Sequence, residues 1–385
     1  MTALPASRNR FTVDLDALAH NYRALSRLAG PTACAAAVKA ECYGLGLDAP
    51  ALRLWQEGCR DFFVATLHEA ARLRAVLPEA RIHVLNGVMD SEIEAFRLLR
   101  AQPVLNSAQQ VALWRAAGAG SAADLMPANL MIDTGMNRLG VRPEEVAGLD
   151  LSGLSLDIAL THLASADEPG NPLTRTQAER FAALAAAVPA RRRSLANSAG
   201  IVEVDGPLHD LARPGIALYG GIVHPRLEGV IRPVVTVEAQ VIHVKTVPAG
   251  ETVGYNATWQ APQACRIATL AIGYADGYLR GFSSKSASKP SGELGAAVEI
   301  NGLRCPVVGR VSMDLATVDV TALPPVRPGD WATLIGGGIT LAEAARWSGL
   351  SQYELLTVSG RRYDRQYRAD ISASRAPEAP QHKGE

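Results

Sequence analysis

Five polar positions lie at or beside the ends of segments that the sequence predicts as buried strands, and their side chains could act together. Lys39 ends the apolar run AAAVK, Arg138 follows LMID, and His162 ends DIALTH. Asn197-Ser198 ends SLANS, and Arg213 precedes GIALYGG. In a barrel of alternating strands and helices, the active site lies at the carboxyl ends of the strands. One lysine or histidine in such a place is usually structural, but five in matching positions indicate a site.

Lys39 is the most informative of these residues. The alanines and valine before it would remove water from its ammonium group, and desolvation lowers the pKa of a lysine. A neutral amine can form a Schiff base with an aldehyde. The run therefore predicts a lysine that reacts with a carbonyl compound.

Ser198, Gly215 and Ile216 predict a phosphate site. They lie beside the seventh and eighth predicted strands, the region where barrels commonly bind phosphate through loop amides and a helix N-terminus. A lysine for an aldehyde beside a phosphate cradle indicates pyridoxal phosphate as the cofactor.

The elements that would position these residues alternate between strand and helix from residue 14 to about 222. Leu15, Leu18, Tyr22, Leu25 and Leu28 recur at helical spacing, with an aspartate at 14 or 16 to cap the start. About eight apolar runs predict strands, which suits a (β/α)8 barrel. The runs are 33–38, 62–65, 82–85, 103–105, 130–132, 156–160, 193–195 and 216–218.

After about residue 226 the chain is rich in β-branched residues and predicts a mainly β domain. Asn301-Gly302 between two such runs indicates a hairpin, because both residues adopt positive φ easily. We expect a barrel over 12–225, a β-rich domain over 226–372 with residues 1–11 packing on it, and a disordered tail over 373–385.

Composition excludes several classes of function. The 385 residues carry 38 Lys+Arg and 38 Asp+Glu, so no long-range field favours nucleic acid or an anionic membrane. No run of residues is long and apolar enough to span a membrane, and the start lacks the apolar segment of a signal peptide. Five cysteines without a metal-ligand spacing predict a cytoplasmic protein with neither structural metal nor disulfides.

Eight segments, in this order, resemble the successive motifs of bacterial alanine racemases. The resemblance covers about residues 10 to 368 and implies the same barrel and β-rich domain. The segments are AVKAECYGLG (37–46), DTGMNRLG (133–140), THLASAD (161–167), LANSAG (195–200), ARPGIALYG (212–220), VGYNATW (253–259), IGYADGY (272–278) and GRVSMD (309–314).

The resemblance implies roles for particular residues. Lys39 would bind the cofactor covalently and act as one of two acid/base groups, with Tyr255 of the partner subunit as the other. This implies a homodimer with shared active sites. The residues implied in cofactor binding are Lys39, Tyr43, Arg138, His162, Ser198, Arg213, Gly215 and Ile216.

The resemblance also implies roles for five residues near the substrate and the ring of the cofactor. Arg138 and the Met313 amide would bind the substrate carboxylate, and Tyr274 and Asp314 would shape the pocket mouth. Arg213 would face the pyridine nitrogen, and its firmly held proton would disfavour transamination.

The implied activity is the interconversion of L- and D-alanine, which supplies D-alanine for peptidoglycan. A racemase removes the Cα proton from one face and returns a proton to the other, so two bases on opposite faces suit it. Two alternatives remain open: a serine racemase or one of broader specificity with the same fold, and a PLP-binding protein without catalysis.

The sequence departs from the family in three places. Met131 replaces a lysine that orients the arginine, which leaves Asn129 on the same strand face as a candidate for that role. Ser194 stands where a histidine usually supports Arg213. A tyrosine that contacts the phosphate aligns with Gly360, with Tyr363 as a candidate substitute.

Overall fold

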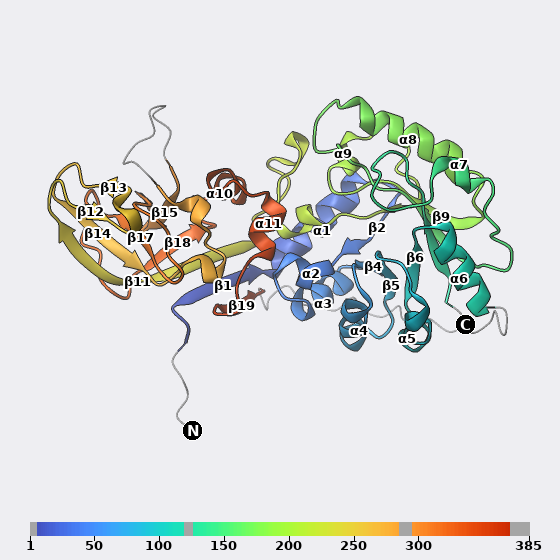
Figure 1. Ribbon diagram of the computed structural model, residues 1–385, viewed down its shortest axis with the longest axis horizontal. Coiled ribbons are helices and arrows are strands. Elements are labelled where there is room, and N and C mark those ends of the chain that lie inside the picture. Colours follow the sequence, from blue (N-terminus) through green and yellow to red (C-terminus); the bar gives the residue numbers. More distant parts are fainter. Residues whose placement is uncertain (1–5, 119–125, 285–294, 370–385) are drawn as a thin grey trace, which may run out of the picture.

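The computed structural model describes residues 6–118, 126–284 and 295–369. The tail expected to be disordered, 373–385, lies outside these ranges. Figure 1 shows an elongated molecule with a helix-covered barrel at one end and a β-rich part at the other. The described residues include no helix with the length and apolar character to cross a membrane.

The barrel is built on a parallel sheet with the order β3-β4-β5-β6-β7-β8-β9. A short further strand, β10, pairs in parallel with β2 and so meets the first edge of this sheet. Backbone bonds also join β10 to the last edge, since the Arg213 N–H donates to the Ala196 carbonyl at 2.8 Å. The strands are β2 (Ala33–Cys34), β3 (Ala36–Ala37), β4 (Asp61–Val64), β5 (Arg81–Val84), β6 (Gln102–Leu105), β7 (Ala128–Met131), β8 (Leu156–Leu160), β9 (Ala190–Ser194) and β10 (Leu211–Ala212).

Helices cover the outside of this sheet (Figure 1). The first begins where the sequence predicts, because the Asp14 carboxylate accepts from the Asp16 and Ala17 amides at 2.9 and 2.8 Å. Its buried residues include Leu18, Tyr22 and Leu25. The helices are α1 (Leu15–Leu28), α2 (Lys39–Tyr43), α3 (Asp48–Gln56), α4 (Leu67–Val76), α5 (Ile93–Leu99), α6 (Ala108–Gly118), α7 (Pro143–Val146), α8 (Pro172–Ala185) and α9 (Gly200–Glu203).

The eighth strand differs from the one that the sequence predicts. The apolar run 216–218 belongs to a 3-10 helix, η3 (Ile216–Tyr219), in which the Leu218 N–H donates to the Gly215 carbonyl. The eighth strand is instead β10, because the carbonyls of Asp210, Ala212 and Pro214 accept from the strand at 33–37. A strand of two residues is too short to be recognised from the periodicity of the sequence.

The β-rich part is organised around β11 (Val235–Val247), a strand of 13 residues. It pairs with β1 (Asn9–Asp14), β14 (Cys265–Leu270) and β18 (Trp331–Ile335), and β1 pairs in parallel with β19 (Asp364–Arg368). The predicted hairpin is present, with Asn301 and Gly302 at positive φ. The remaining elements are β12 (Thr252–Val253), β13 (Trp259–Gln260), β15 (Ala297–Ile300), β16 (Leu303–Pro306), β17 (Ala316–Asp319), α10 (Leu341–Ser348) and α11 (Gln352–Thr357).

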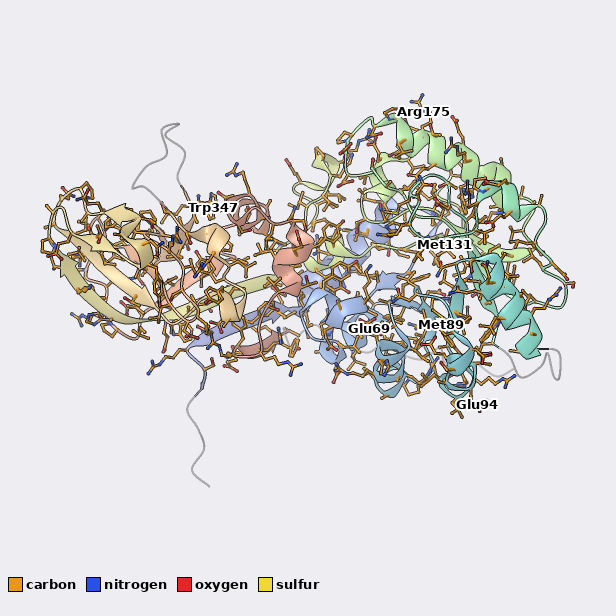
Figure 2. All side chains as sticks on the ribbon, in the orientation of Figure 1. Glu69, Met89, Glu94, Met131, Arg175 and Trp347 are labelled. Atoms are coloured by element: carbon orange, nitrogen blue, oxygen red, sulfur yellow. The ribbon has the colours of Figure 1, made fainter. Side chains whose placement is uncertain are left out.

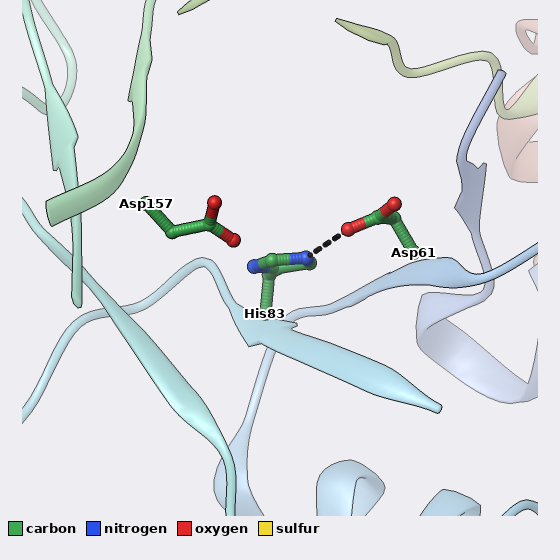
Figure 3. A group of neighbouring side chains, drawn as sticks. All are labelled: Asp61, His83 and Asp157. Atoms are coloured by element: carbon green, nitrogen blue, oxygen red, sulfur yellow. Dashed lines mark hydrogen bonds and ion pairs between the residues drawn. The ribbon is translucent and has the colours of Figure 1, made fainter. Parts of the chain in front are cut away.

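A buried network of charges closes the amino-terminal end of the barrel. Figure 3 shows Asp61, His83 and Asp157, which come from β4, β5 and β8 and meet in the interior. Arg192 donates to both carboxylates at 2.7 to 3.1 Å, and Arg81 donates to Asp61 at 2.7 and 2.9 Å. Two guanidinium groups thus already neutralise the two carboxylates, and the cluster is a structural ion network.

Asp61→Asn should destabilise the protein in a pH-dependent way. Burial alone would raise the pKa of Asp61, but the hydrogen bonds from His83, Arg81 and Arg192 outweigh it and hold the pKa well below its usual range. The carboxylate therefore stabilises the fold above its unfolded pKa of about 3.9 and loses this effect as the pH falls further. We expect a loss of about 3 kcal/mol at pH 7, shrinking below about pH 4.

Urea unfolding of wild type and variant between pH 7 and 3.5 measures this difference. Glu94→Gln is the matched control, because Glu94 (Figure 2) is exposed and should change the free energy of unfolding by less than about 0.5 kcal/mol. Equal effects of the two substitutions would refute the stabilising role of the network.

Candidate active site

A cavity of about 440 Å³ lies at the carboxyl ends of the barrel strands, within the size range of small-molecule sites. It brings together all the residues that the sequence predicts for cofactor binding. These are Lys39, Tyr43, Arg138, His162, Ser198, Arg213, Gly215 and Ile216.

Lys39 opens a turn of rare conformation. The short helix α2 that follows β3 is left-handed, with φ of 51°, 56°, 52° and 58° at Ala40, Glu41, Cys42 and Tyr43. The left-handed region costs about 1–2 kcal/mol for each residue with a side chain, so this turn persists only because its surroundings hold it. It places the lysine and Tyr43 on the wall of one cavity.

The electrostatics favour a neutral amine at Lys39. Burial lowers the pKa of Lys39, and the nearby charge of Arg138 lowers it further, while Glu69 acts in the opposite direction. A neutral amine is the form that reacts with an aldehyde and accepts a proton. The structure thus agrees with the electrostatic environment that the sequence predicts for this residue.

His162 is held neutral by the same environment. Burial lowers the pKa of His162 to about 3, with contributions from Arg213, Arg138 and Lys39. The imidazole therefore carries no charge near neutral pH, and it suits packing against a ligand rather than proton transfer.

Arg213 is buried at the floor of the cavity and fixed by two acceptors. Its Nη1 donates to the Ser194 hydroxyl and its Nη2 to the Thr161 carbonyl, while the Ser194 hydroxyl donates to the Leu211 carbonyl at 2.5 Å. Burial lowers the pKa of Arg213 to about 10, which still leaves it charged at neutral pH. Ser194 therefore supports this arginine, although a histidine is usual there in the resembling family.

The predicted phosphate site has a compact geometry. The Ser198 hydroxyl accepts from the amides of Gly215 and Ala217 at 2.9 and 3.3 Å. A Cβ on Gly215 would lie 2.2 Å from the Tyr43 hydroxyl. The hydroxyl can therefore approach the backbone this closely only because residue 215 has no side chain. These groups, together with the amine of Lys39 and the guanidinium groups of Arg138 and Arg213, fit a phosphorylated aldehyde.

Two expected supporting residues lie elsewhere. The Asn129 amide donates to His83 Nδ1 and the Pro103 carbonyl at 3.1 and 3.3 Å, because it faces the charged network and not Arg138. Tyr363 packs edge-on against Phe11 with ring centroids 5.7 Å apart and does not line the cavity. Met131 (Figure 2) lines a neighbouring cavity of about 290 Å³ together with Lys39 and Arg138.

Sequence reasoning missed the contribution of helix α11 to the cavity. Tyr353, Glu354 and Thr357 from this helix line it, as does Asp167. The ring of Tyr353 lies 6.2 Å from that of Tyr43. No local pattern marks these residues, because only the docking of α11 against the barrel brings them to the site.

The remaining predicted residues form a separate group on the β-rich part. Tyr255 and Met313 are 63% and 54% exposed and do not line the cavity. The Tyr274 amide donates to the Ser312 carbonyl at 3.0 Å, which ties the turn at 274 to the loop that carries Met313 and Asp314. Tyr255 lies in the segment between β12 and β13, two strands of the β-rich part that lie away from the barrel (Figure 1).

Known proteins resemble this chain along nearly its whole length. Residues 13–223 match the family model of the alanine racemase N-terminal domain, and 234–367 match that of the C-terminal domain. An alanine racemase of Methylobacterium nodulans is 45% identical over 375 residues, covering 95% of this chain and 98% of the relative. A biosynthetic alanine racemase of Agrobacterium fabrum is 41% identical, covering 93% of each chain.

A solved structure with a bound cofactor is similar as well. The alanine racemase of Bartonella henselae with covalently bound pyridoxal phosphate has a TM-score of 0.87 and 35% identity. The match covers 94% of this chain and 100% of the other.

Gly215→Ala should weaken binding of the cofactor. The added methyl group would overlap Tyr43, and such overpacking costs about 1–3 kcal/mol, which corresponds to roughly 5- to 150-fold in affinity. The visible absorbance retained after dialysis, relative to protein, measures this loss. Gly148→Ala is the control, since its Cβ would meet only the Glu145 carbonyl oxygen at 3.7 Å. Equal retention in both variants would contradict the proposed cradle.

Proposed function

The chain belongs to the alanine racemase family, and on this premise we propose that two copies of the chain share each active centre. The chain interconverts L- and D-alanine with pyridoxal phosphate as cofactor. The barrel of one copy would bind the cofactor, and the exposed group around Tyr255 and Met313 would reach it from a partner. The observation that carries this proposal is the exposure of Tyr255 and its absence from the cavity lining.

The cavity fits the cofactor. Lys39 would hold its aldehyde carbon, and Tyr43, Ser198 and the Gly215 and Ile216 backbone would hold its phosphate. When bound, pyridoxal phosphate supplies an electron sink that makes the Cα proton of alanine removable. The close approach of the Tyr43 hydroxyl to the backbone of Gly215 supports this placement of the phosphate.

Two side chains would move protons at Cα. The lowered pKa of Lys39 favours an amine that accepts a proton on one face. Tyr255 of the partner would serve the opposite face, because one side chain cannot reach both sides of the same carbon. Each group takes the proton in one direction of the reaction and returns one in the other.

The cationic side chains would orient the ligands. Arg138 makes no hydrogen bond or ion pair to other described residues, so its guanidinium can bind the substrate carboxylate together with the partner's Met313 amide. Arg213 donates hydrogen bonds to the Ser194 hydroxyl and the Thr161 carbonyl, and one of its remaining N–H groups would face the pyridine nitrogen. Since a guanidinium keeps its proton, the ring would stay a weak electron sink, which favours reprotonation at Cα over transamination.

The proposal extends to the role and setting of the enzyme. The family relationship favours supply of D-alanine for peptidoglycan, and the name of the Agrobacterium fabrum relative supports a biosynthetic role. Five free cysteines support a cytoplasmic location. The proposed domain boundary lies between residues 225 and 226, with Tyr274 and Asp314 at the pocket mouth. Neither a serine racemase, nor one of broader specificity, nor a non-catalytic cofactor-binding protein has support from the relatives.

Solvent exchange at Cα separates the roles of Lys39 and Tyr255. Lys39→Ala should lose the visible absorbance of the bound cofactor and all racemisation. Tyr255→Phe should keep the absorbance but racemise about 100-fold or more slowly, because it lacks one proton-transfer group. When Tyr255→Phe is incubated with L- or D-alanine in heavy water, deuterium uptake at Cα should persist for one enantiomer only.

Tyr363→Phe is the matched control, since it removes a hydroxyl that does not line the cavity. It should retain both activities. Full racemisation by Tyr255→Phe in both directions would overturn the two-base assignment.

A further inference from the structure

The left-handed turn after Lys39 is held at both ends by side chains outside it. Inside the turn, the Gly44 amide donates to the Ala40 carbonyl at 2.7 Å and the Gly46 amide to the Glu41 carbonyl at 2.9 Å. These bonds leave the Ala40 amide and the carbonyls of Gly44 and Leu45 for other partners. Each of these three groups meets a side chain from a distant part of the chain.

Glu69 holds the beginning of the turn from the barrel side. Its Oε1 accepts from the Ala40 amide at 2.7 Å, and its Oε2 accepts from the Ala65 and Thr66 amides at 2.7 and 3.2 Å. The bond from the Thr66 amide is part of the capping box of α4, which fixes the carboxylate. Glu69 (Figure 2) therefore links the residue after Lys39 to the rigid start of a barrel helix.

The carboxyl-terminal strand holds the other end. The Tyr367 hydroxyl donates to the Leu45 carbonyl at 3.0 Å, and Arg365 donates to the Gly44 carbonyl at 2.8 Å. Both residues belong to β19, which pairs with β1 in the sheet of the β-rich part. The fit is close, because a Cβ on Gly46 would lie 2.1 Å from the Tyr367 hydroxyl.

This arrangement explains how a strained turn persists beside the reacting amine. Four left-handed residues store an energy that internal hydrogen bonds alone would not offset, and strain of this kind needs support from its surroundings. The lysine is the first residue of α2, so any relaxation of the turn moves its amine relative to the cavity.

We propose that Glu69 and Tyr367 are positioning residues for Lys39, which clamp the left-handed turn from the barrel and from the carboxyl-terminal strand. This inference rests on the proposed role of Lys39 as the cofactor-binding lysine. It makes the placement of a barrel residue depend on a strand near the far end of the chain.

Hydrogen exchange of the holoenzyme, followed by mass spectrometry, tests the clamp without relying on activity. In Glu69→Ala and in Tyr367→Phe, amides of residues 40–46 should exchange about 2- to 10-fold faster, as expected for the loss of one hydrogen bond. The cofactor should also leave faster during dialysis against hydroxylamine. Glu69→Gln should give an intermediate exchange rate, because its single amide oxygen can replace only one of the two carboxylate oxygens that accept from backbone amides.

Two matched controls remove similar groups away from the turn. Glu145→Ala removes a capping glutamate from α7, and Tyr363→Phe removes a hydroxyl close to β19. Neither should change exchange at 40–46. If Glu69→Ala and Tyr367→Phe match these controls while Lys39→Ala loses the cofactor absorbance, the clamp is overturned and the proposed function stands. If Lys39→Ala keeps that absorbance, the role of Lys39 and the clamp both fail.

Discussion

The active centre depends on the left-handed turn that follows Lys39. Four consecutive residues with side chains adopt positive φ there, and they bring both the lysine and Tyr43 to one cavity wall. The turn also explains nearby glycines, since Gly44 lies against the Leu356 carbonyl and Gly215 against the Tyr43 hydroxyl. Strain at this point is therefore part of how the site is shaped, and several distant segments of the chain hold it in place.

Burial beside like charges determines the protonation of the site. Lys39, Arg138 and Arg213 line one cavity with His162, and their mutual repulsion combines with burial to lower the pKa values of the amine and the imidazole. The arginines stay charged, so anionic groups of a ligand find partners while Lys39 can accept a proton. The chain as a whole is neutral, but two arginines line this one cavity, together with the carboxylates of Asp167 and Glu354.

The sequence identifies barrel residues that line one cavity, but it does not identify the residues that support them. Lys39 and His162 are recognisable because each ends an apolar run, and strand ends of a barrel converge. The eighth strand, β10, cannot be recognised from the sequence because it has two residues, and its pairing with β2 depends on contacts distant in sequence. Asn129 shares a strand with Met131 but bonds to His83, and Tyr353 reaches the cavity only through the docking of α11. Such contacts leave no local pattern.

In the proposed arrangement, each active centre combines Lys39 of one copy with Tyr255 of another. Coexpression of Lys39→Ala and Tyr255→Phe chains with different affinity tags allows isolation of dimers that contain one chain of each kind. In a shared arrangement, one of the two sites in such a dimer is native, so about half of the wild-type specific activity should return. Mixed dimers as inactive as the two parent variants would contradict the claim.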